Sequence, residues 1–220
     1  MTSPDGFARV DEVGDWCRGW IAPTPEFMRR ASHVLIDRDD VAWIVDPVAG
    51  PPLTEAVGDR AVGGVIQLMD RHNRHCAAVA AHYDVPHLRT PPTGDGTPFE
   101  SVPVVTQPRL GWVEIALWWP ERSTLVVADA LGTSDYHRAP GEDVGVHPLL
   151  RAVAPPRVLA RYPARHVLFG HGEGIHGPDA AERVARAVDG ARAGIAPLGL
   201  RGARAAGRAG VGAVRRVLGR

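Results

Sequence analysis

Short apolar runs separated by turn-forming residues dominate the first part of the chain. Residues 33–37 and 41–46 each have a strand pattern, and the Arg-Asp-Asp segment at 38–40 predicts a tight turn between them, and so a hairpin. Two prolines open a short helix predicted over 51–58, because Pro suits the first helical turn. A further apolar run predicts a strand over 64–69.

The second part of the chain alternates strand and helix patterns between loops rich in Gly, Pro, Ser and Asp at 90–100 and 131–147. The predicted elements are a helix from about 74 to 84, strands near 101–106, 112–119, 124–128 and 166–169, helical pieces over 147–153 and 156–162, and a helix over 179–189. Two runs of strands and helices fit an α/β (α+β) fold, a four-layer αββα sandwich. A doubly wound single sheet is the alternative, but the early hairpin and the strand pair at 112–128 argue against it.

Composition bounds the class of protein. The length of 220 residues and a hydrophobic content of 45% suit one domain, placed over 1–190, with a substantial core. The formal net charge is zero, so no global field indicates a nucleic acid or membrane partner. All basic residues are Arg, which excludes chemistry through a Lys Schiff base.

The expected location is the bacterial cytoplasm. Cys17 and Cys76 are isolated in sequence, which favours a reducing compartment over a disulfide framework. The sequence has no run of about 18 apolar residues, so no membrane span is expected. The start of the chain has neither a charged segment nor an apolar core of a signal peptide.

The segment 191–220 has a different composition, with seven Arg, seven Gly and no acidic residue. Because Gly costs about 1 kcal/mol per helical position relative to Ala, the segment is expected to be a partly disordered tail or a frayed helix. The usual interpretation of such a basic run is a solvated tail, and the alternative is an arm that binds anions. No aromatic residue is interleaved, which argues against base stacking with a nucleic acid.

Three apolar runs each end in side chains able to bind a metal. The run 64–69 is followed by Asp70-Arg71-His72-Asn73-Arg74-His75, the run 124–128 by Asp129, and the run 166–169 by Gly170-His171-Gly172. Three strands that deliver such ligands at their carboxyl ends predict one shared site at a rim of the sheets. Taken singly, His72 and His75 could instead cap a helix, and Asp70 could be an N-cap. His137, His147 and His176 lie in predicted loops that could line the pocket, but they are expected at the surface.

This order of residues resembles the metallo-β-lactamase fold superfamily, in which the first motif reads His-x-His-x-Asp-His and later strands end in a bridging Asp and in Gly-His. The resemblance covers roughly residues 30–190 and implies the αββα fold. His72 and His75 match the second and third histidines, Asp129 the bridging carboxylate and His171 the final histidine. Asp70 stands in place of the first His and Arg74 in place of the Asp. The family's remaining His usually lies just before the strand that precedes the bridging Asp, and the corresponding stretch 107–112 has no histidine.

The Arg at position 74 limits what the site can hold. Arginine stays protonated and offers no lone pair, so it cannot be a ligand. At about 4 Å and an effective dielectric near 20, its charge would repel a second unit charge by roughly 4 kcal/mol. The expectation is at most one metal, held by a subset of Asp70, His72, His75, Asp129 and His171. In the alternative, Arg74 takes the place of the metal and pairs with Asp129 or Asp70.

Two functions follow from the resemblance. The first is a hydrolase with one zinc, iron or manganese ion, which cleaves an ester, thioester, amide or phosphate bond of a small molecule. Asp70 or Asp129 would orient the water or accept its proton, and Arg74 would hold an anionic group of the substrate. The second is a metal-free, non-catalytic relative that keeps the pocket and binds a ligand or partner.

Overall fold

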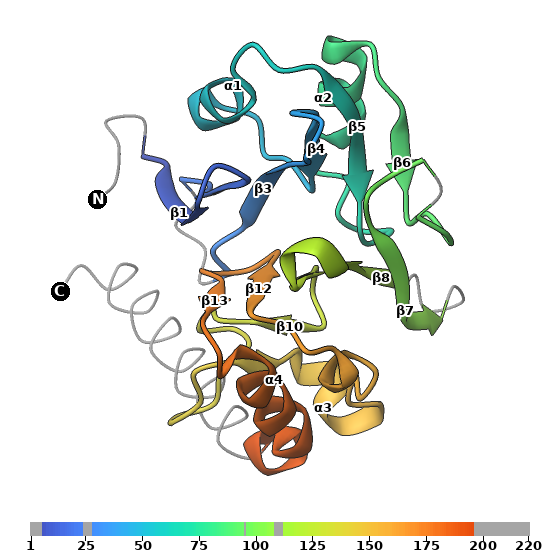
Figure 1. Cartoon of the computed structure of the whole chain (residues 1–220). Helices are drawn as coiled ribbons and strands as arrows, with labels where there is room; N and C mark the ends of the chain where they lie inside the picture. Colours follow the sequence, from blue (N-terminus) through green and yellow to red (C-terminus); the bar gives the residue numbers. More distant parts are fainter. Residues whose placement is uncertain (1–5, 24–27, 95, 108–111, 196–220) are drawn as a thin grey trace, which may run out of the picture.

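The structure is a computed structural model that describes residues 6–23, 28–94, 96–107 and 112–195. Two β-sheets pack face to face, and helices cover the outer face of each sheet (Figure 1). The expected four-layer αββα sandwich is therefore confirmed.

The first sheet has six strands in the order β1-β2-β3-β4-β5-β6. Its strands are β1 (Ala8–Val13), β2 (Cys17–Ile21), β3 (Ala31–Ile36), β4 (Ala42–Val45), β5 (Val62–Gln67) and β6 (His87–Arg89). The first four strands pair antiparallel, and β4, β5 and β6 are parallel. The helices α1 (Pro51–Val57) and α2 (Cys76–Tyr83) form the two crossovers of this parallel part.

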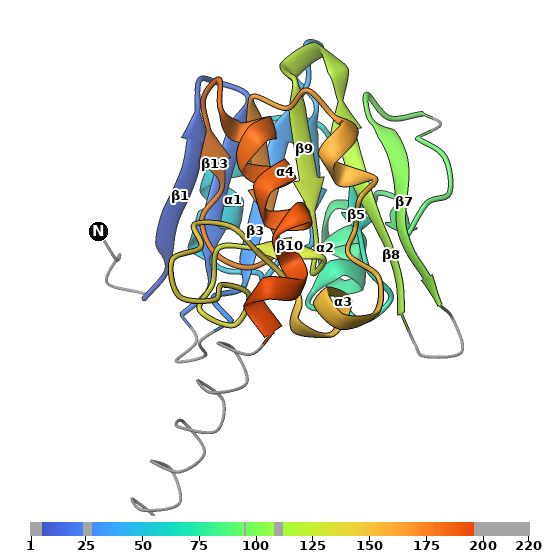
Figure 2. The same cartoon turned by 90° about the horizontal axis from the view of Figure 1, so that it is seen from below.

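The second sheet has five strands in the order β13-β12-β9-β8-β7. Its strands are β7 (Glu100–Gln107), β8 (Trp112–Trp119), β9 (Thr124–Val127), β12 (His166–Phe169) and β13 (Ile175–His176). The parallel pair β9–β12 lies at the centre of this sheet. Figure 2 shows α3 (Pro148–Val153) and α4 (Ala180–Asp189) across its outer face. The 3-10 helices are η2 (Pro120–Arg122), η3 (Leu159–Arg161) and η4 (Ala191–Gly194), and β10 (Leu131–Gly132) pairs with β11 (Gly145–Val146).

Burial on both faces explains why the central strands are continuous apolar runs. In β3 and β4, Leu35 and Val45 face the second sheet, whereas Val34 and Ile44 pack toward the outer helices. Neighbouring side chains of a strand point to opposite faces, so a strand buried on both sides needs apolar residues at every position. This pattern identified β3, β4, β5, β9 and β12 in the sequence.

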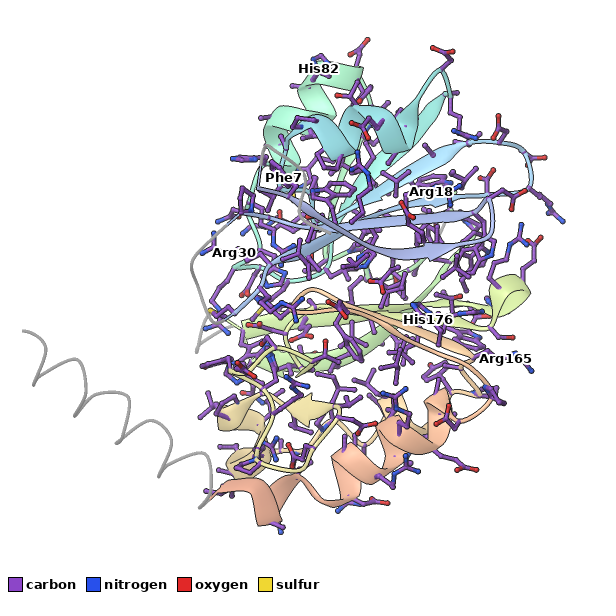
Figure 3. The ribbon with its side chains drawn as sticks, turned by 90° about the vertical axis from the view of Figure 1, so that its left-hand side faces the viewer. Phe7, Arg18, Arg30, His82, Arg165 and His176 are labelled. Atoms are coloured by element: carbon purple, nitrogen blue, oxygen red, sulfur yellow. The ribbon has the colours of Figure 1, made fainter. Side chains whose placement is uncertain are left out.

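The two sheets meet at the rim where β5 and β9 end. The peptide N–H of Asp70 donates to the carbonyl of Val113 at 3.0 Å, and that of Ile115 donates to Leu68 at 2.9 Å. On the other side of this rim Arg30 forms an isolated bridge with His171. Figure 3 shows Arg30 at one end of the strands and Arg165, which precedes β12, at the other. The carboxyl ends of β5, β9 and β12 therefore lie at a common edge.

Several elements differ from the sequence-based expectation. The hairpin β1–β2 precedes the predicted opening hairpin, and β6 extends the first sheet at its other edge. Both β1 and β6 are edge strands with exposed polar residues, so neither carries the apolar run that marks a central strand. Only the three residues of η3 are helical within the predicted helix over 156–162, and prolines stand at its start.

The packed body extends slightly beyond residue 190. Ala191 is fully buried, and its carbonyl accepts a hydrogen bond from Arg151 Nη1 at 3.0 Å. The predicted tail over 191–220 lies outside the described residues from 196 onward. None of the helices in the described part of the chain is long and apolar enough to cross a bilayer.

Candidate metal centre

Three buried side chains meet at the rim shared by the two sheets. Each comes from the segment after a strand: His72 follows β5, Asp129 follows β9 and His171 follows β12. Asp129 Oδ1 lies 3.0 Å from His171 Nε2 and 3.8 Å from His72 Nε2, and the two Nε2 atoms are 3.3 Å apart. Among the described residues, this is the one group of three or more His, Cys, Asp or Glu whose ligand atoms converge closely enough for a metal ion.

The far nitrogen of each imidazole is held so that its Nε2 lone pair points into the group. His72 Nδ1 lies 2.8 Å from Asp46 Oδ2, and His171 Nδ1 lies 3.0 Å from the carbonyl oxygen of Met28. Carboxylate and carbonyl oxygens accept hydrogen bonds, so Nδ1 of each neutral ring carries the proton. Metal-binding histidines are oriented in this way by a second hydrogen bond.

The spacing of the three atoms suits a single tetrahedral ion. Zinc bonds of about 2.0–2.1 Å place two ligands of a tetrahedron about 3.3 Å apart, close to the three separations found here. Asp129 Oδ1 is buried and, among the described residues, accepts no hydrogen bond of proper geometry despite its short contact with His171. Three lone pairs that converge without a proton donor between them fit a cation.

The ionisation of the group follows from its burial and its charges. Burial alone would raise the pKa of Asp129, but the adjacent imidazoles of His171 and His72 hold that pKa well below its ordinary value. Burial lowers the pKa of His171, which keeps this ring neutral. Burial and the Arg74 charge also act to lower the pKa of His72, yet the carboxylates of Asp46 and Asp129 outweigh them and raise it. In the absence of a cation, His72 is thus the ring that takes up a proton.

Asp46 supports the site without belonging to the three. Its Oδ1 accepts a hydrogen bond from the Leu68 peptide at 3.1 Å, while its Oδ2 faces His72. It has a φ of 44°, in the left-handed region that Asp tolerates better than most residues. The sequence-based interpretation missed Asp46, because its contact with His72, 26 residues away, could not be predicted from the sequence.

Two of the five predicted ligands lie outside the group. His75 is exposed at the start of α2, where its Nδ1 accepts a hydrogen bond from the Ala49 peptide at 2.9 Å. Asp70 has a buried Oδ1 without a hydrogen-bond partner among the described residues, but its carboxylate is not within reach of the group around His72. In this conformation the candidate centre offers three potential protein ligands.

The hydrogen-bond partners of Arg74 differ from those predicted from the sequence. The expectation was an ion pair with Asp129 or Asp70, or a contact with substrate. Instead its guanidinium donates hydrogen bonds to three backbone carbonyls: Ala31, Asp46 at 2.8 Å and Gly170 at 2.8 Å. A buried guanidinium needs several acceptors, and the ends of three strands supply them here. Arg74 therefore joins the two sheets behind the site.

Arg71 is the arginine that lies beside Asp129. Its Nη2 is 4.0 Å from Asp129 Oδ2, and its guanidinium stacks over the Trp112 ring at 4.6 Å from the centroid. Half of its side chain is exposed, compared with a tenth of the Asp129 side chain. Arg71 thus stands at the solvent side of the group, where Arg74 was expected.

Glu114, in β8, is a fully buried carboxylate that the sequence-based interpretation missed. Its Oε1 accepts hydrogen bonds from the peptides of Asp129 at 2.9 Å and Ala130 at 2.8 Å, and its Oε2 accepts from Trp112 Nε1 at 3.0 Å. Burial and the nearby Asp129 charge raise the pKa of Glu114 to about 7. A lone polar residue among the apolar positions of a strand was the one signal available for it.

His137 and His147 are buried next to the group, which corrects their predicted surface position. His137 Nε2 donates to the Asp129 carbonyl at 3.0 Å, and its Nδ1 lies 2.8 Å from Ser134 Oγ. His147 Nδ1 accepts from the Leu149 peptide at 3.2 Å as the N-cap of α3. Burial lowers the pKa of His137 to about 3 and that of His147 to about 4, so both rings are neutral. Their nitrogens are already used in hydrogen bonds, so neither ring is a ligand.

His176 is exposed as expected, but its Nε2 lies 3.1 Å from Asp11 Oδ1. It therefore belongs to a second polar group at the opposite end of β12, away from the candidate centre.

Comparison with known proteins agrees with this arrangement at the level of the fold. No protein-family model matches the sequence, and no curated protein matches it. Solved structures do match. The DIM-1 metallo-β-lactamase superposes with a TM-score of 0.54 at 15% identity, covering 83% of this chain and 97% of its own. TMB-1 superposes with a TM-score of 0.53 at 13% identity, covering 84% of this chain and 98% of its own.

A third similar structure, a metallo-β-lactamase from Pontibacter korlensis, has a TM-score of 0.55 at 11% identity and covers 82% of this chain and 98% of its own. All three likenesses extend over most of the chain and over nearly the whole of the matched structures. At such low identity they establish the architecture and leave the activity to be argued from the site. The chain therefore has the metallo-β-lactamase fold.

Proposed function

We propose that this protein is a metal-dependent hydrolase with a single-metal site, acting on an ester, thioester, amide or phosphate bond of a small molecule. The observation that carries the proposal is the convergence of three oriented, buried donor atoms: His72 Nε2, His171 Nε2 and Asp129 Oδ1. These residues would hold a zinc, iron or manganese ion. Such an ion would supply Lewis-acid polarisation of the scissile bond and a nucleophile at neutral pH.

The remaining groups of the site divide between positioning and proton transfer. Asp46 and the Met28 carbonyl orient the two imidazoles. Asp129 has one oxygen in the ligand group and the other toward Arg71 at the solvent side, and this second oxygen supports a role in accepting a proton from an attacking water. We assign this role to Asp129 and not to Asp70, whose carboxylate is outside the group.

A second candidate function is a metal-free relative that binds a ligand without catalysis. Two observations favour it: in the resembling motif Arg74 stands in place of the acidic ligand, and His75 is exposed outside the group, with its Nδ1 engaged by the Ala49 peptide. In that case a protonated His72 between Asp46 and Asp129 would take the place of the ion. The raised pKa of His72 agrees with this state of the site.

Metal content separates the two candidates. We expect protein purified without chelator to contain about one equivalent of zinc, iron or manganese per chain, and the His171→Ala variant to contain little. Zinc added to metal-depleted protein should raise its Tm, because an ion that binds only the folded state stabilises it. Hydrolysis of chromogenic esters, thioesters, amides and phosphate esters then identifies the bond. Absence of metal together with an unchanged Tm on adding zinc would leave only the non-catalytic function.

We also infer a reducing compartment, the bacterial cytoplasm, as its location. Cys17 and Cys76 are both free and buried. Buried free thiols are typical of proteins that are not exposed to an oxidising environment.

A further inference from the structure

We propose that Arg71 binds an oxyanion of the substrate, so that the site acts on small anionic molecules with a carboxylate or phosphate group close to the scissile bond. That the bound anion is part of a substrate rests on the proposed hydrolytic function. Binding of the anion is a separate property that can be measured on its own.

The first argument is the position of Arg71. It directly precedes His72 in the chain, and its Nη2 lies 4.0 Å from Asp129 Oδ2. Half of the Arg71 side chain is exposed, although the three side chains of the candidate centre are buried. Arg71 therefore offers a solvent-accessible cation directly beside Asp129.

The second argument is that the guanidinium rests on a fixed platform. Its carbon lies 4.6 Å from the centroid of the Trp112 ring, which is buried. Trp112 Nε1 donates to Glu114 Oε2 at 3.0 Å, and the His147 ring contacts the indole edge-on at 4.8 Å. Stacking occupies the face of the guanidinium and leaves its N–H groups, which lie in the plane, available to a ligand.

The third argument is the contrast with the other arginines around the site. Arg74 uses its guanidinium on three backbone carbonyls, and Arg29 pairs with Glu173 at 2.7 Å. Arg71 forms no hydrogen bond with any described residue, and among those residues the one carboxylate within 4.0 Å is that of Asp129. A cation bound by Asp129 would share that negative charge, which leaves the charge of Arg71 to attract an anion.

The chemistry of the side chain selects the class of ligand. The fork of N–H donors in a guanidinium matches two oxygens of a carboxylate or a phosphate, and such charge-assisted pairs are the stronger hydrogen bonds in proteins. A neutral analogue of the same size would leave the fork unpaired. The site should therefore prefer substrates with an oxyanion.

The test is calorimetric titration with inorganic phosphate and, separately, with acetate at low ionic strength. The proteins compared are wild type, Arg71→Gln, Arg71→Lys and the control Arg157→Gln, each both metal-depleted and zinc-loaded. Arg157 is exposed and pairs with Asp189 at 3.6 Å, so its replacement removes the same charge from another part of the surface. Circular dichroism and Tm verify that each variant is folded.

We expect Arg71→Gln to weaken binding of the anion by about tenfold or more in both metal states, the effect of losing a charge-assisted hydrogen bond. Arg71→Lys should bind with intermediate affinity, because it keeps the charge and loses the fork. Arg157→Gln should bind like wild type. Preference for phosphate or for acetate would support the proposal and name the anionic group of the substrate.

Equal affinity of wild type and Arg71→Gln, within about twofold, would overturn the proposal, as would an equal loss in Arg157→Gln. These outcomes differ from a failure of the hydrolytic function. That failure would appear as wild-type protein without metal or hydrolysis, in which anion binding still depends on Arg71.

Discussion

Arg74 Nη2 donates a hydrogen bond of 2.8 Å to the carbonyl oxygen of Gly170, a residue 96 positions later in the chain and on the other sheet. The same guanidinium also binds the carbonyls of Ala31 and Asp46. Asp46 orients His72, and Gly170 directly precedes His171. One buried cation thus fixes the strand ends that present both histidines. The Arg in place of an acidic ligand has a structural role behind the site.

Replacing Arg74 by Met should destabilise the fold. The variant removes all three hydrogen bonds by which the guanidinium joins the two sheets, and we expect a loss of about 3 kcal/mol in the free energy of unfolding. Chemical denaturation at neutral pH measures the change. Arg74→Asp, which restores the acidic residue of the resembling motif, should be more damaging, because it adds a carboxylate beside Asp46 and the same carbonyls.

Arg89→Met is the matched control for this variant. Arg89 is exposed and donates to a single carbonyl, that of Asp70, at 3.0 Å. Its replacement should change the free energy of unfolding by no more than about 0.5 kcal/mol. Equal stabilities of Arg74→Met and Arg89→Met would contradict the role of Arg74 in joining the sheets.

Asp46→Asn should impair metal binding without unfolding the protein. The amide oxygen can still accept from Leu68, and Asn tolerates the φ of 44°. The amide NH₂ would face His72 Nδ1, however, which favours the tautomer that carries its proton on Nε2 and blocks the ligand atom. We expect zinc affinity to fall about 10- to 100-fold, measured by competition with a chromophoric chelator.

Ser32→Ala serves as the comparison for Asp46→Asn. Ser32 Oγ donates to the backbone carbonyl of Asp46 at 2.9 Å and accepts from the Val48 peptide at 2.9 Å, whereas the Asp46 carboxylate is what faces His72. This variant should lower stability and keep the zinc affinity of wild type. Zinc binding by Asp46→Asn at the wild-type Kd would rule out the orienting role of Asp46.

His75→Ala and His72→Ala should differ in metal content. His75 is exposed and its Nδ1 is engaged by the Ala49 peptide, whereas His72 Nε2 points at Asp129 and His171. We expect His75→Ala to keep the metal of wild type and His72→Ala to lose it, as determined by elemental analysis of both variants purified side by side. Loss of the metal in both would mean that His75 turns inward when the site is loaded.

Asp11 should make stability depend on pH. Its carboxylate joins the sheets through His33 at 2.9 Å, His176 at 3.1 Å and the Gly174 peptide at 2.7 Å. Burial acts to raise the pKa of Asp11, but the hydrogen bonds from His176 and His33 lower it well below its ordinary value. A carboxyl with a lowered pKa stabilises the fold above the unfolded pKa of about 3.9, and this contribution is lost as the pH falls further.

Asp11→Asn should therefore cost about 2 kcal/mol in the free energy of unfolding near neutral pH, with the difference from wild type narrowing below about pH 4. Denaturation curves over a series of pH values measure it. Asp189→Asn makes the same change in charge at an exposed side chain and should follow wild type at each pH. A difference for Asp11→Asn that stays constant over the pH series would argue against a titrating contribution from this carboxyl.

The layered fold was accessible from the sequence because its central strands are buried on both faces. The run at 166–169 coincides with β12, and the run at 112–119 coincides with β8. Such runs are determined by local composition. The edge strands β1 and β6 were missed because exposed positions at a sheet edge do not require apolar side chains. These segments become strands because they pair with a neighbouring strand.

Much of the candidate centre could also be predicted from the sequence, because side chains that follow parallel strands gather at one rim of the sheets. The structure brings His72, Asp129 and His171 together in this way, and their binding of a metal stays a prediction. Glu114 gave no comparable signal, because it lies within β8 and accepts hydrogen bonds from the peptides of Asp129 and Ala130, two residues that follow β9.

The central strands and the residues at their carboxyl ends were determined by the sequence itself, because apolar burial and strand polarity are properties of short segments. Which of those residues face one another was decided by the tertiary structure. The turn from Asp70 to His75 has no regular period, and Arg74 within it has a φ of 38°. The directions of its side chains therefore depend on partners that the fold supplies: three carbonyls for Arg74, Trp112 for Arg71 and the Ala49 peptide for His75.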